Sequence, residues 1–372
     1  MSAQDQLLDG HRISGGGSAR LYLDGEEFLN FSGCNYLALN DRPELREAAN
    51  VALNDGSLFT RYLAPAYGGI DAAFDEVEQE AAKLYGTESA IYFASGYLIG
   101  FAAMAGLRDL FDVVVLDEQA HWCMVDAAKI SGAEMFRFAN CDEESLRQVL
   151  SEHCRNKRPL IATDGAYATS GQLPPLDAYA ELAARYDGQI FVDESHSAGG
   201  VGATGRGAVE HFGLRERAHV GTTLSKGFCG LGAVFVGSGD QVEKAYGAPA
   251  LRGSNPGSPL GARVSAAALR LVRENPEMCA RLRENADYLR SGLRALGLEI
   301  IETPAPFVSF TTGDFDFMRS IQQALFDDRI YVLHSNYIAA GPGGTLRLSV
   351  FRDHTRADID RVVARISELL KK

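Results

Sequence analysis

Apolar and polar positions along this chain follow two different periods, and the alternation between them predicts an α/β fold. Residues 71–86 repeat apolar side chains three and four positions apart, which predicts an amphipathic helix. Its apolar face consists of Phe74, Val77, Ala81 and Leu84. Short continuous apolar runs follow, separated by helical patterns: SAIYFAS, VVVLD, PLIATD, QIFVDE, HVGTTL and GAVFVG. Such runs are typical of a mostly parallel sheet covered on both faces.

The pattern changes at the glycine- and proline-rich segment LRGSNPGSPLG, residues 251–261. Beyond it we expect two helical stretches, helices at FDFMRSIQQALFDD and RADIDRVVARISELL, and strands at LEIIET, FVSFTT, YVLHS and TLRLSVF. Before residue 46 lie a Gly-rich loop, SGGGS, and two extended stretches, ARLYLDG and EEFLNFSG. We therefore predict an N-terminal arm over residues 1–45, a large domain over 46–250 and a smaller C-terminal α/β domain over 251–372.

Composition narrows the functional classes. No apolar run approaches the roughly 20 residues that span a bilayer, and the polar start MSAQDQLLDGHRIS does not resemble a signal peptide, so we expect a cytoplasmic protein outside the membrane. The net charge is −13 and no basic stripe occurs, which argues against nucleic acid as a partner. The six cysteines form no CxxC pair or metal-ligand cluster, so we expect free thiols and no metal site.

Two short strings carry the candidate chemistry, VDESH at residues 192–196 and TTLSK at residues 222–226. Each stands at the C-terminal end of a predicted buried strand, where ligands bind in α/β sheets. Pyridoxal phosphate (PLP) requires a lysine amine for a Schiff base and an acidic partner for its ring nitrogen. Lys226 and Asp193 can fill these two roles, and His196 can donate to the cofactor's phenolic oxygen or to the substrate imine.

Other residues are suited to the remaining parts of such a cofactor. Thr223 and Ser225 offer hydroxyl groups for a phosphate close to the amine. The turn ASGYLIG places Gly96 and Tyr97 between a strand and a helix start, where free backbone N–H groups bind phosphate. His121 follows VVVLDEQA and could stack its ring on a flat heterocycle.

Together these segments resemble the α-oxoamine synthase family of fold-type I PLP enzymes. The resemblance runs through NYLAL, ASGY, AHWCMVDA, DGAYATSGQLPPL, VDESHSAGGVGATGRG, GTTLSKGFCGLG and GTLRLSV, and so covers nearly the whole chain. SLF at residues 57–59, NYLAL and VDESHS are more similar to α-aminoketone autoinducer synthases than to 8-amino-7-oxononanoate synthase. The resemblance implies a large domain with a mostly parallel sheet of the seven-stranded type.

The resemblance also implies a role for each candidate residue. Lys226 would form the Schiff base, Asp193 would pair with the pyridinium, His121 would stack on the ring and His196 would bond the cofactor oxygen. Thr223, Gly96 and Tyr97 would hold the phosphate.

Three further positions follow from the family only. Arg347 in GTLRLSV would clamp the carboxylate of the amino acid, which a guanidinium holds through two parallel hydrogen bonds. Ser254 and Asn255 would reach the phosphate of a partner subunit, which implies a homodimer with shared active sites. Asn35 would line the substrate pocket.

The implied activity is that of a PLP-dependent acyltransferase used in biosynthesis. Lys226 would remove the α-proton of an amino acid, and the resulting carbanion would attack an acyl thioester. Decarboxylation usually follows and gives an α-aminoketone. This chain departs from the family at Ala168, where a serine is common, and at SNYIAAGPGG, which replaces a proline-bearing segment before the last strands.

Two alternatives remain. Another PLP-dependent reaction on the same fold, such as C–C cleavage, decarboxylation or cyclisation, would use Asp193 and Lys226 equally well. A dinucleotide-binding loop is suggested by Gly200, Gly202 and Gly205, which form G-x-G-x-x-G. That loop must directly follow a strand and open a helix, whereas DESHSA intervenes here, so we disfavour a dehydrogenase.

Overall fold

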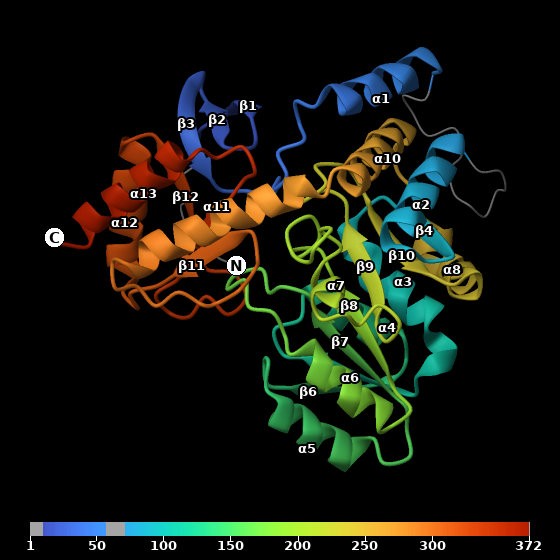
Figure 1. Cartoon of the computed structure of the whole chain (residues 1–372). Helices are drawn as coiled ribbons and strands as arrows, with labels where there is room; N and C mark the ends of the chain where they lie inside the picture. Colours follow the sequence, from blue (N-terminus) through green and yellow to red (C-terminus); the bar gives the residue numbers. More distant parts are fainter. Residues whose placement is uncertain (1–9, 57–70, 372) are drawn as a thin grey trace.

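The computed structural model describes residues 10–56 and 71–371. Its larger sheet has seven strands in the order β4-β10-β9-β8-β7-β5-β6 (Figure 1). All neighbouring pairs are parallel except those that β10 makes with β4 and β9. These strands are β4 (Ser89–Phe93), β5 (Val113–Asp117), β6 (Glu134–Phe138), β7 (Pro159–Asp164), β8 (Gln189–Asp193), β9 (His219–Thr223) and β10 (Ala233–Gly237). The predicted mostly parallel, seven-stranded sheet is therefore confirmed.

Helices cover both faces of this sheet because its strands are apolar on both sides. Along β5, Val113 and Val115 pack into one hydrophobic cluster, whereas Val114 and Leu116 pack into another. The first cluster includes side chains of α2 (Ala72–Tyr85), α5 (Glu143–His153), α6 (Leu176–Ala184) and α10 (Pro259–Glu274). The second includes side chains of α3 (Ile99–Gly106), α4 (Trp122–Ile130) and α8 (Gly239–Tyr246).

The first helix of the large sheet begins and ends where its sequence predicts. The side chain of Asp71 accepts a hydrogen bond from the backbone N–H of Ala73 and so caps α2. Gly86 follows the last turn with φ of 65°, in the left-handed region that glycine adopts without steric cost. The predicted helix over residues 71–86 is confirmed.

The smaller sheet joins the two ends of the chain. Its six strands run in the order β1-β2-β3-β12-β13-β11, and β3 pairs parallel with β12. They are β1 (Ile13–Gly16), β2 (Arg20–Leu23), β3 (Glu26–Phe31), β11 (Phe307–Phe310), β12 (Ile330–Ser335) and β13 (Thr345–Ser349). Figure 1 shows the blue N-terminal strands beside the orange and red helices α11 (Glu277–Arg294), α12 (Phe315–Asp327) and α13 (Arg356–Leu369). The proposed domain limits at residues 45 and 250 stay predictions.

One predicted strand is wrong. The segment LEIIET, residues 298–303, has no β-structure. The carbonyl oxygen of Ile300 accepts from the guanidinium of Arg294 at the end of α11, and Glu302 forms an ion pair with the same side chain. Thr303 donates to the carbonyl of Gly171 in a loop. Because these polar partners do not belong to a neighbouring strand, the segment does not extend the sheet.

Some elements were not predicted. Strand β6 reads EMFRF, and its two charged residues break the apolar run, as an edge strand tolerates. The remaining helices are short or lie outside the sheets: α1 (Pro43–Asn54), α7 (Ala208–His211), α9 (Pro249–Arg252) and the 3₁₀ turns Gly96–Leu98 and Arg108–Leu110. The SLF motif at residues 57–59 lies outside the described residues.

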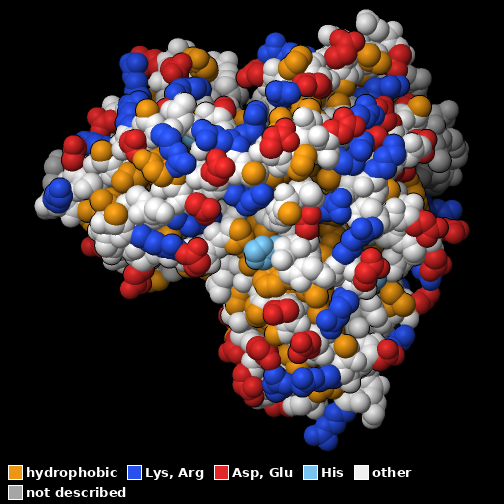
Figure 2. All heavy atoms as spheres, viewed as in Figure 1, with side chains coloured by type: hydrophobic (Ala, Val, Ile, Leu, Met, Phe, Trp, Pro, Cys, Tyr) orange, Lys and Arg blue, Asp and Glu red, His pale blue; other side chains and the backbone are white. Residues whose placement is uncertain are grey.

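Surface properties complete the description. Within residues 10–56 and 71–371, no helix is both long and apolar enough to cross a membrane. On the face shown in Figure 2, acidic and basic side chains are interspersed.

Candidate active site

The C-terminal ends of neighbouring strands form a cavity of about 280 Å³. The strand register sets Asp164 of β7 directly beside Asp193 of β8, and Lys226 follows the end of β9. The lining residues come from the ends of five strands, β4, β5, β7, β8 and β9, and the loops that follow them: Ser95, Gly96, Tyr97, His121, Asp164, Ala166, Asp193, Ser195, His196, Thr223, Ser225 and Lys226. Eight of the sequence-predicted site residues thus meet in one cavity.

Asp193 is held in place from both carboxylate oxygens. Its side chain is 4% exposed, Oδ1 accepts from the backbone N–H of Ser195 at 3.0 Å, and Oδ2 lies 3.9 Å from the thiol sulfur of Cys123. Burial raises the pKa of the Cys123 thiol, and the charge of Asp193 raises it further. Cys123 therefore stays protonated and can donate its S–H to the carboxylate.

A chain of polar contacts leads from Lys226 into the small sheet. Lys226 Nζ lies 3.0 Å from His196 Nε2, and His196 Nδ1 lies 3.1 Å from the hydroxyl of Tyr36. Arg347 donates from Nη2 to that hydroxyl at 2.9 Å. Burial, followed by the charges of Lys226 and Arg347, holds the pKa of His196 well below its usual range. His196 is therefore a neutral imidazole beside the amine.

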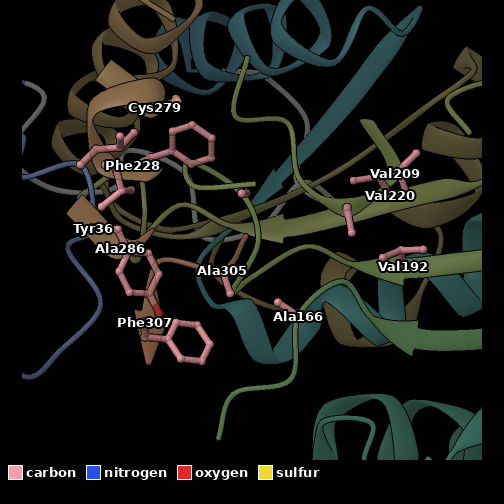
Figure 3. Packing of buried hydrophobic residues seen from close by; sticks show 14 of the residues in the cluster. Tyr36, Ala166, Val192, Val209, Val220, Phe228, Cys279, Ala286, Ala305 and Phe307 are labelled. Carbon is pink, nitrogen blue, oxygen red and sulfur yellow. The ribbon is translucent and has the colours of Figure 1, made fainter. Parts of the chain in front are cut away.

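Arg347 is buried and already engaged. Its Nε donates to the carbonyl of Ala168 at 2.7 Å and its Nη1 to Ser349 Oγ at 2.7 Å. Its guanidinium lies over the ring of Phe307, 3.9 Å from the ring centre. Figure 3 shows Tyr36 and Phe307 close together, in agreement with their 6.0 Å ring separation. Arg347 does not line the cavity and contacts it through Tyr36, so its role as a carboxylate clamp stays a prediction.

His121 begins the helix that borders the cavity. His121 is the N-cap of α4, and its ring Nδ1 accepts from the backbone N–H of Cys123 at 3.2 Å. The backbone N–H of His121 donates to Asp164 Oδ1 at 3.2 Å. Burial lowers the pKa of His121. A neutral ring in this position suits stacking on a heterocycle.

Three hydroxyl groups, those of Thr223, Ser225 and Ser195, lie together in the cavity lining. Thr223 Oγ1 lies 2.8 Å from Ser225 Oγ, and the backbone N–H of Thr223 donates to Ser195 Oγ at 3.2 Å. A Cβ on Gly96 would lie 3.1 Å from Thr223 Cβ and Oγ1, so only glycine fits this approach comfortably. Gly96 also begins the 3₁₀ turn that leads into α3, whose N-terminus favours an anion.

Besides Arg347, three predicted residues lie outside the cavity. Asn35 donates to Asn40 Oδ1 at 3.3 Å. Ser254 donates to the carbonyl of Ala250, and Asn255 accepts from the backbone of Gly257 at 2.9 Å. Ser254 and Asn255 belong to the connection between α9 and α10, so any contact that they make with a phosphate stays a prediction.

Sequence reasoning missed Asp164 and Tyr36. Burial and the neighbouring charge of Asp193 raise the pKa of Asp164 well above its usual range. Its signal was available, because Asp164 ends the run PLIATD as Asp193 ends QIFVD. Tyr36 lies within NYLAL, but only the tertiary contact with Arg347 and His196 gives it a part in the site.

The donor set fits PLP. An amine, a buried carboxylate, a neutral imidazole ring and two hydroxyl groups surround one cavity, and a glycine backbone borders its hydroxyl-lined end. These groups match an aldehyde carbon, a ring nitrogen, a ring face and a phosphate, respectively. The cavity therefore supplies a suitable partner for each part of this cofactor.

Comparisons with known proteins agree with the geometry. The sequence profile of aminotransferase class I and II proteins matches residues 26–366. An 8-amino-7-oxononanoate synthase of Symbiobacterium thermophilum is 30% identical, over 94% of this chain and 90% of its own length. A second, of Coprothermobacter proteolyticus, is 29% identical over 95% and 91%. A solved serine palmitoyltransferase from S. paucimobilis with bound PLP is 26% identical, with a TM-score of 0.90 over 98% of this chain and 95% of its own.

Proposed function

The chain belongs to the aminotransferase class I and II family, and we propose that it is a PLP-dependent acyltransferase of the α-oxoamine synthase type. It condenses an amino acid with an acyl thioester, usually with decarboxylation, to an α-aminoketone. The observation that carries this proposal is the meeting of Lys226, Asp193, His121 and His196 in one cavity. The likeness to condensing enzymes over the full chain selects this reaction over the other PLP chemistries.

Different lining residues would hold different parts of the cofactor. Lys226 would hold the aldehyde carbon and Asp193 the ring nitrogen, while His121 would cover one ring face. The phosphate would meet Gly96, Tyr97, Thr223 and Ser225. When bound, PLP accepts the electron pair that the substrate carbon releases.

The protein's own groups move and hold the proton. Lys226 Nζ would take the proton from the α-carbon of the amino acid. His196 lies 3.0 Å away and, as a neutral imidazole, keeps the amine oriented without adding a second positive charge. Arg347 would hold the amino-acid carboxylate, with Tyr36 linking the guanidinium to His196.

Assembly and location complete the proposal. A homodimer would let Ser254 and Asn255 of one subunit reach the phosphate site of the other, because neither residue lines the cavity of its own chain. The resemblance to α-oxoamine synthases supports this arrangement, and the likeness to biosynthetic enzymes supports a cytoplasmic location.

A matrix of amino acids and acyl thioesters, assayed for thiol release, tests the reaction. We expect at least one pair to release thiol in stoichiometric amount with the aminoketone. Lys226→Ala should abolish both thiol release and exchange of the α-proton, whereas Lys157→Ala, at an exposed lysine outside the cavity, should change neither. Consumption of an amino acid alone, without thiol release from any pair, would establish the lyase or decarboxylase alternative.

A further inference from the structure

Three aromatic side chains form a row that begins at the cavity lining and continues beside it. Tyr97 lines the cavity and is 42% exposed, and Trp122, the only tryptophan of the chain, is 46% exposed. Tyr337 packs against Trp122 with 5.0 Å between ring centres. We call these three residues the aromatic rim. Large apolar side chains with this much exposure beside a binding cavity indicate a surface that a ligand covers.

The aromatic rim is continuous with the cofactor site. The ring of His121 lies 6.2 Å from that of Tyr97 and 6.4 Å from that of Trp122. Tyr337 is itself partly buried, and burial raises the pKa of its hydroxyl. A substrate whose reacting carbon is at Lys226 would therefore leave the cavity past these rings.

Two parts of the fold hold the aromatic rim in place. Trp122 is the first residue of α4, which packs against the large sheet. Tyr337 belongs to the connection between β12 and β13 of the small sheet. That connection is fastened at both sides of Tyr337. Thr169 Oγ1 donates to the carbonyl of Ile338 at 2.6 Å, and the backbone N–H of Tyr337 donates to Ser335 Oγ at 3.2 Å.

The charges at the aromatic rim decide which part of a thioester it suits. The hydroxyl of Tyr97 donates to Asp126, and Lys129 forms an ion pair with the same carboxylate at 3.8 Å. The cation at this border is therefore already paired with an acid. Flat rings beside a lysine that already has an acidic partner favour an apolar chain over a diphosphate or a phosphopantetheine phosphate.

We propose that the aromatic rim binds the acyl chain of the thioester substrate, and that Trp122 sets the preference for chain length. This inference rests on the proposed function, because it presumes an acyl thioester as the second substrate. Trp122 is then a specificity-determining residue, while the amino acid is held by other groups.

The lone tryptophan makes binding visible without turnover. S-acyl-N-acetylcysteamine thioesters with short, medium and long saturated chains are added, without amino acid, to the cofactor-free and the PLP-loaded protein. We expect a saturable change of tryptophan emission that grows with chain length. Free N-acetylcysteamine should cause no change. Because no condensation is needed, this titration reports on the aromatic rim even if the proposed reaction is wrong.

Variants separate a binding role from a structural one. Trp122→Ala should raise the KM for the preferred thioester roughly tenfold, equivalent to ~1.4 kcal/mol of lost binding. The dissociation constant of the amino acid, read from the cofactor absorbance, should not change. Trp122→Phe keeps a ring and should restore most of the affinity. Tyr288→Ala, at a half-exposed tyrosine on α11 outside the cavity, is the matched control and should leave both constants unaltered.

Two results would overturn the inference. One is an equal emission change with free N-acetylcysteamine, which would assign the aromatic rim to the thiol carrier. The other is an unchanged KM for the thioester in Trp122→Ala, which would leave the rings without a substrate role.

Discussion

At the scale of single residues, two neighbouring aspartates have opposite properties. Asp193 Oδ1 accepts from the backbone N–H of Ser195, whereas burial and the adjacent charge raise the pKa of Asp164 well above its usual range. Two carboxylates side by side cannot both ionise freely. Asp164 therefore carries the proton of the pair.

Isosteric substitutions test this division. We expect Asp193→Asn to lower the rate of α-proton exchange by about 100-fold or more, because the amide cannot hold a proton on the ring nitrogen. Asp164→Asn should cost less than about tenfold near neutral pH, since burial and the charge of Asp193 already favour the uncharged form of the native side chain. Exchange of the α-proton in deuterated water measures both. A larger loss in Asp164→Asn than in Asp193→Asn would contradict the assignment.

Tyr36 is the residue that joins the two sheets at the site. Tyr36→Phe leaves an Arg347 donor and a nitrogen of His196 without this buried partner, so we expect a loss of about 1–3 kcal/mol in unfolding free energy and a higher KM for the amino acid. Urea unfolding and amino-acid titration measure the two effects. Tyr22→Phe, at an exposed tyrosine bonded to Glu27, is the control and should change neither. If Tyr36→Phe kept the wild-type unfolding free energy and KM, the hydroxyl of Tyr36 would have no role in the site.

At the scale of elements, Glu78 joins α2, β4 and α8. Its Oε1 accepts from the backbone N–H of Tyr92 at 2.9 Å and from the hydroxyl of Tyr246 at 2.6 Å. Burial raises its pKa to about 7. The folded protein thus holds a proton on Glu78 more tightly than the unfolded chain does, and this contribution to stability falls as the pH rises from about 4.5 to about 7.

Glu78→Gln should remove that pH dependence. The amide oxygen can accept both hydrogen bonds but does not ionise, so we expect the variant to exceed the wild type by on the order of 1–3 kcal/mol at pH 8 and to match it at pH 4.5. Chemical unfolding at both pH values measures the difference. Glu47→Gln, on the exposed face of α1, is the control and should match the stability of the wild type at both pH values. If Glu78→Gln were less stable at pH 8, the carboxylate would be charged and stabilising.

Elements and site differ in how well the sequence predicted them. The helix over residues 71–86 was readable because Asp71 and Gly86 mark its ends locally. LEIIET was misread and EMFRF was missed because the partners of each segment, Arg294 for one and the sheet edge for the other, lie outside the segment. The cavity followed from strand ends, whereas Tyr36 entered the site only through contacts about 160 and 310 residues away.

At the scale of the whole molecule, the proposed dimer predicts complementation between subunits. Lys226→Ala and the double variant Ser254→Ala/Asn255→Ala should each have little activity alone. After mixing and exchange of subunits, a hybrid dimer contains one site with both sets intact, so we expect about a quarter of wild-type activity to return. Thiol release measures it, and sedimentation checks the dimer. Mixtures that recover nothing while hybrids form would place Ser254 and Asn255 outside a shared site.

The smaller sheet constrains the order in which the chain folds during synthesis. Strand β3 leaves the ribosome early, yet its parallel partner β12 follows about 300 residues later. Until then, the edge of β3 has no neighbour on that side, and an unpaired strand edge invites association with other chains. Strands β1, β2 and β3 can therefore complete their sheet only after β12 has been made. The large sheet, whose strands lie between β3 and β12 in the sequence, can fold first. The earliest strands of the nascent chain are among the last to be secured.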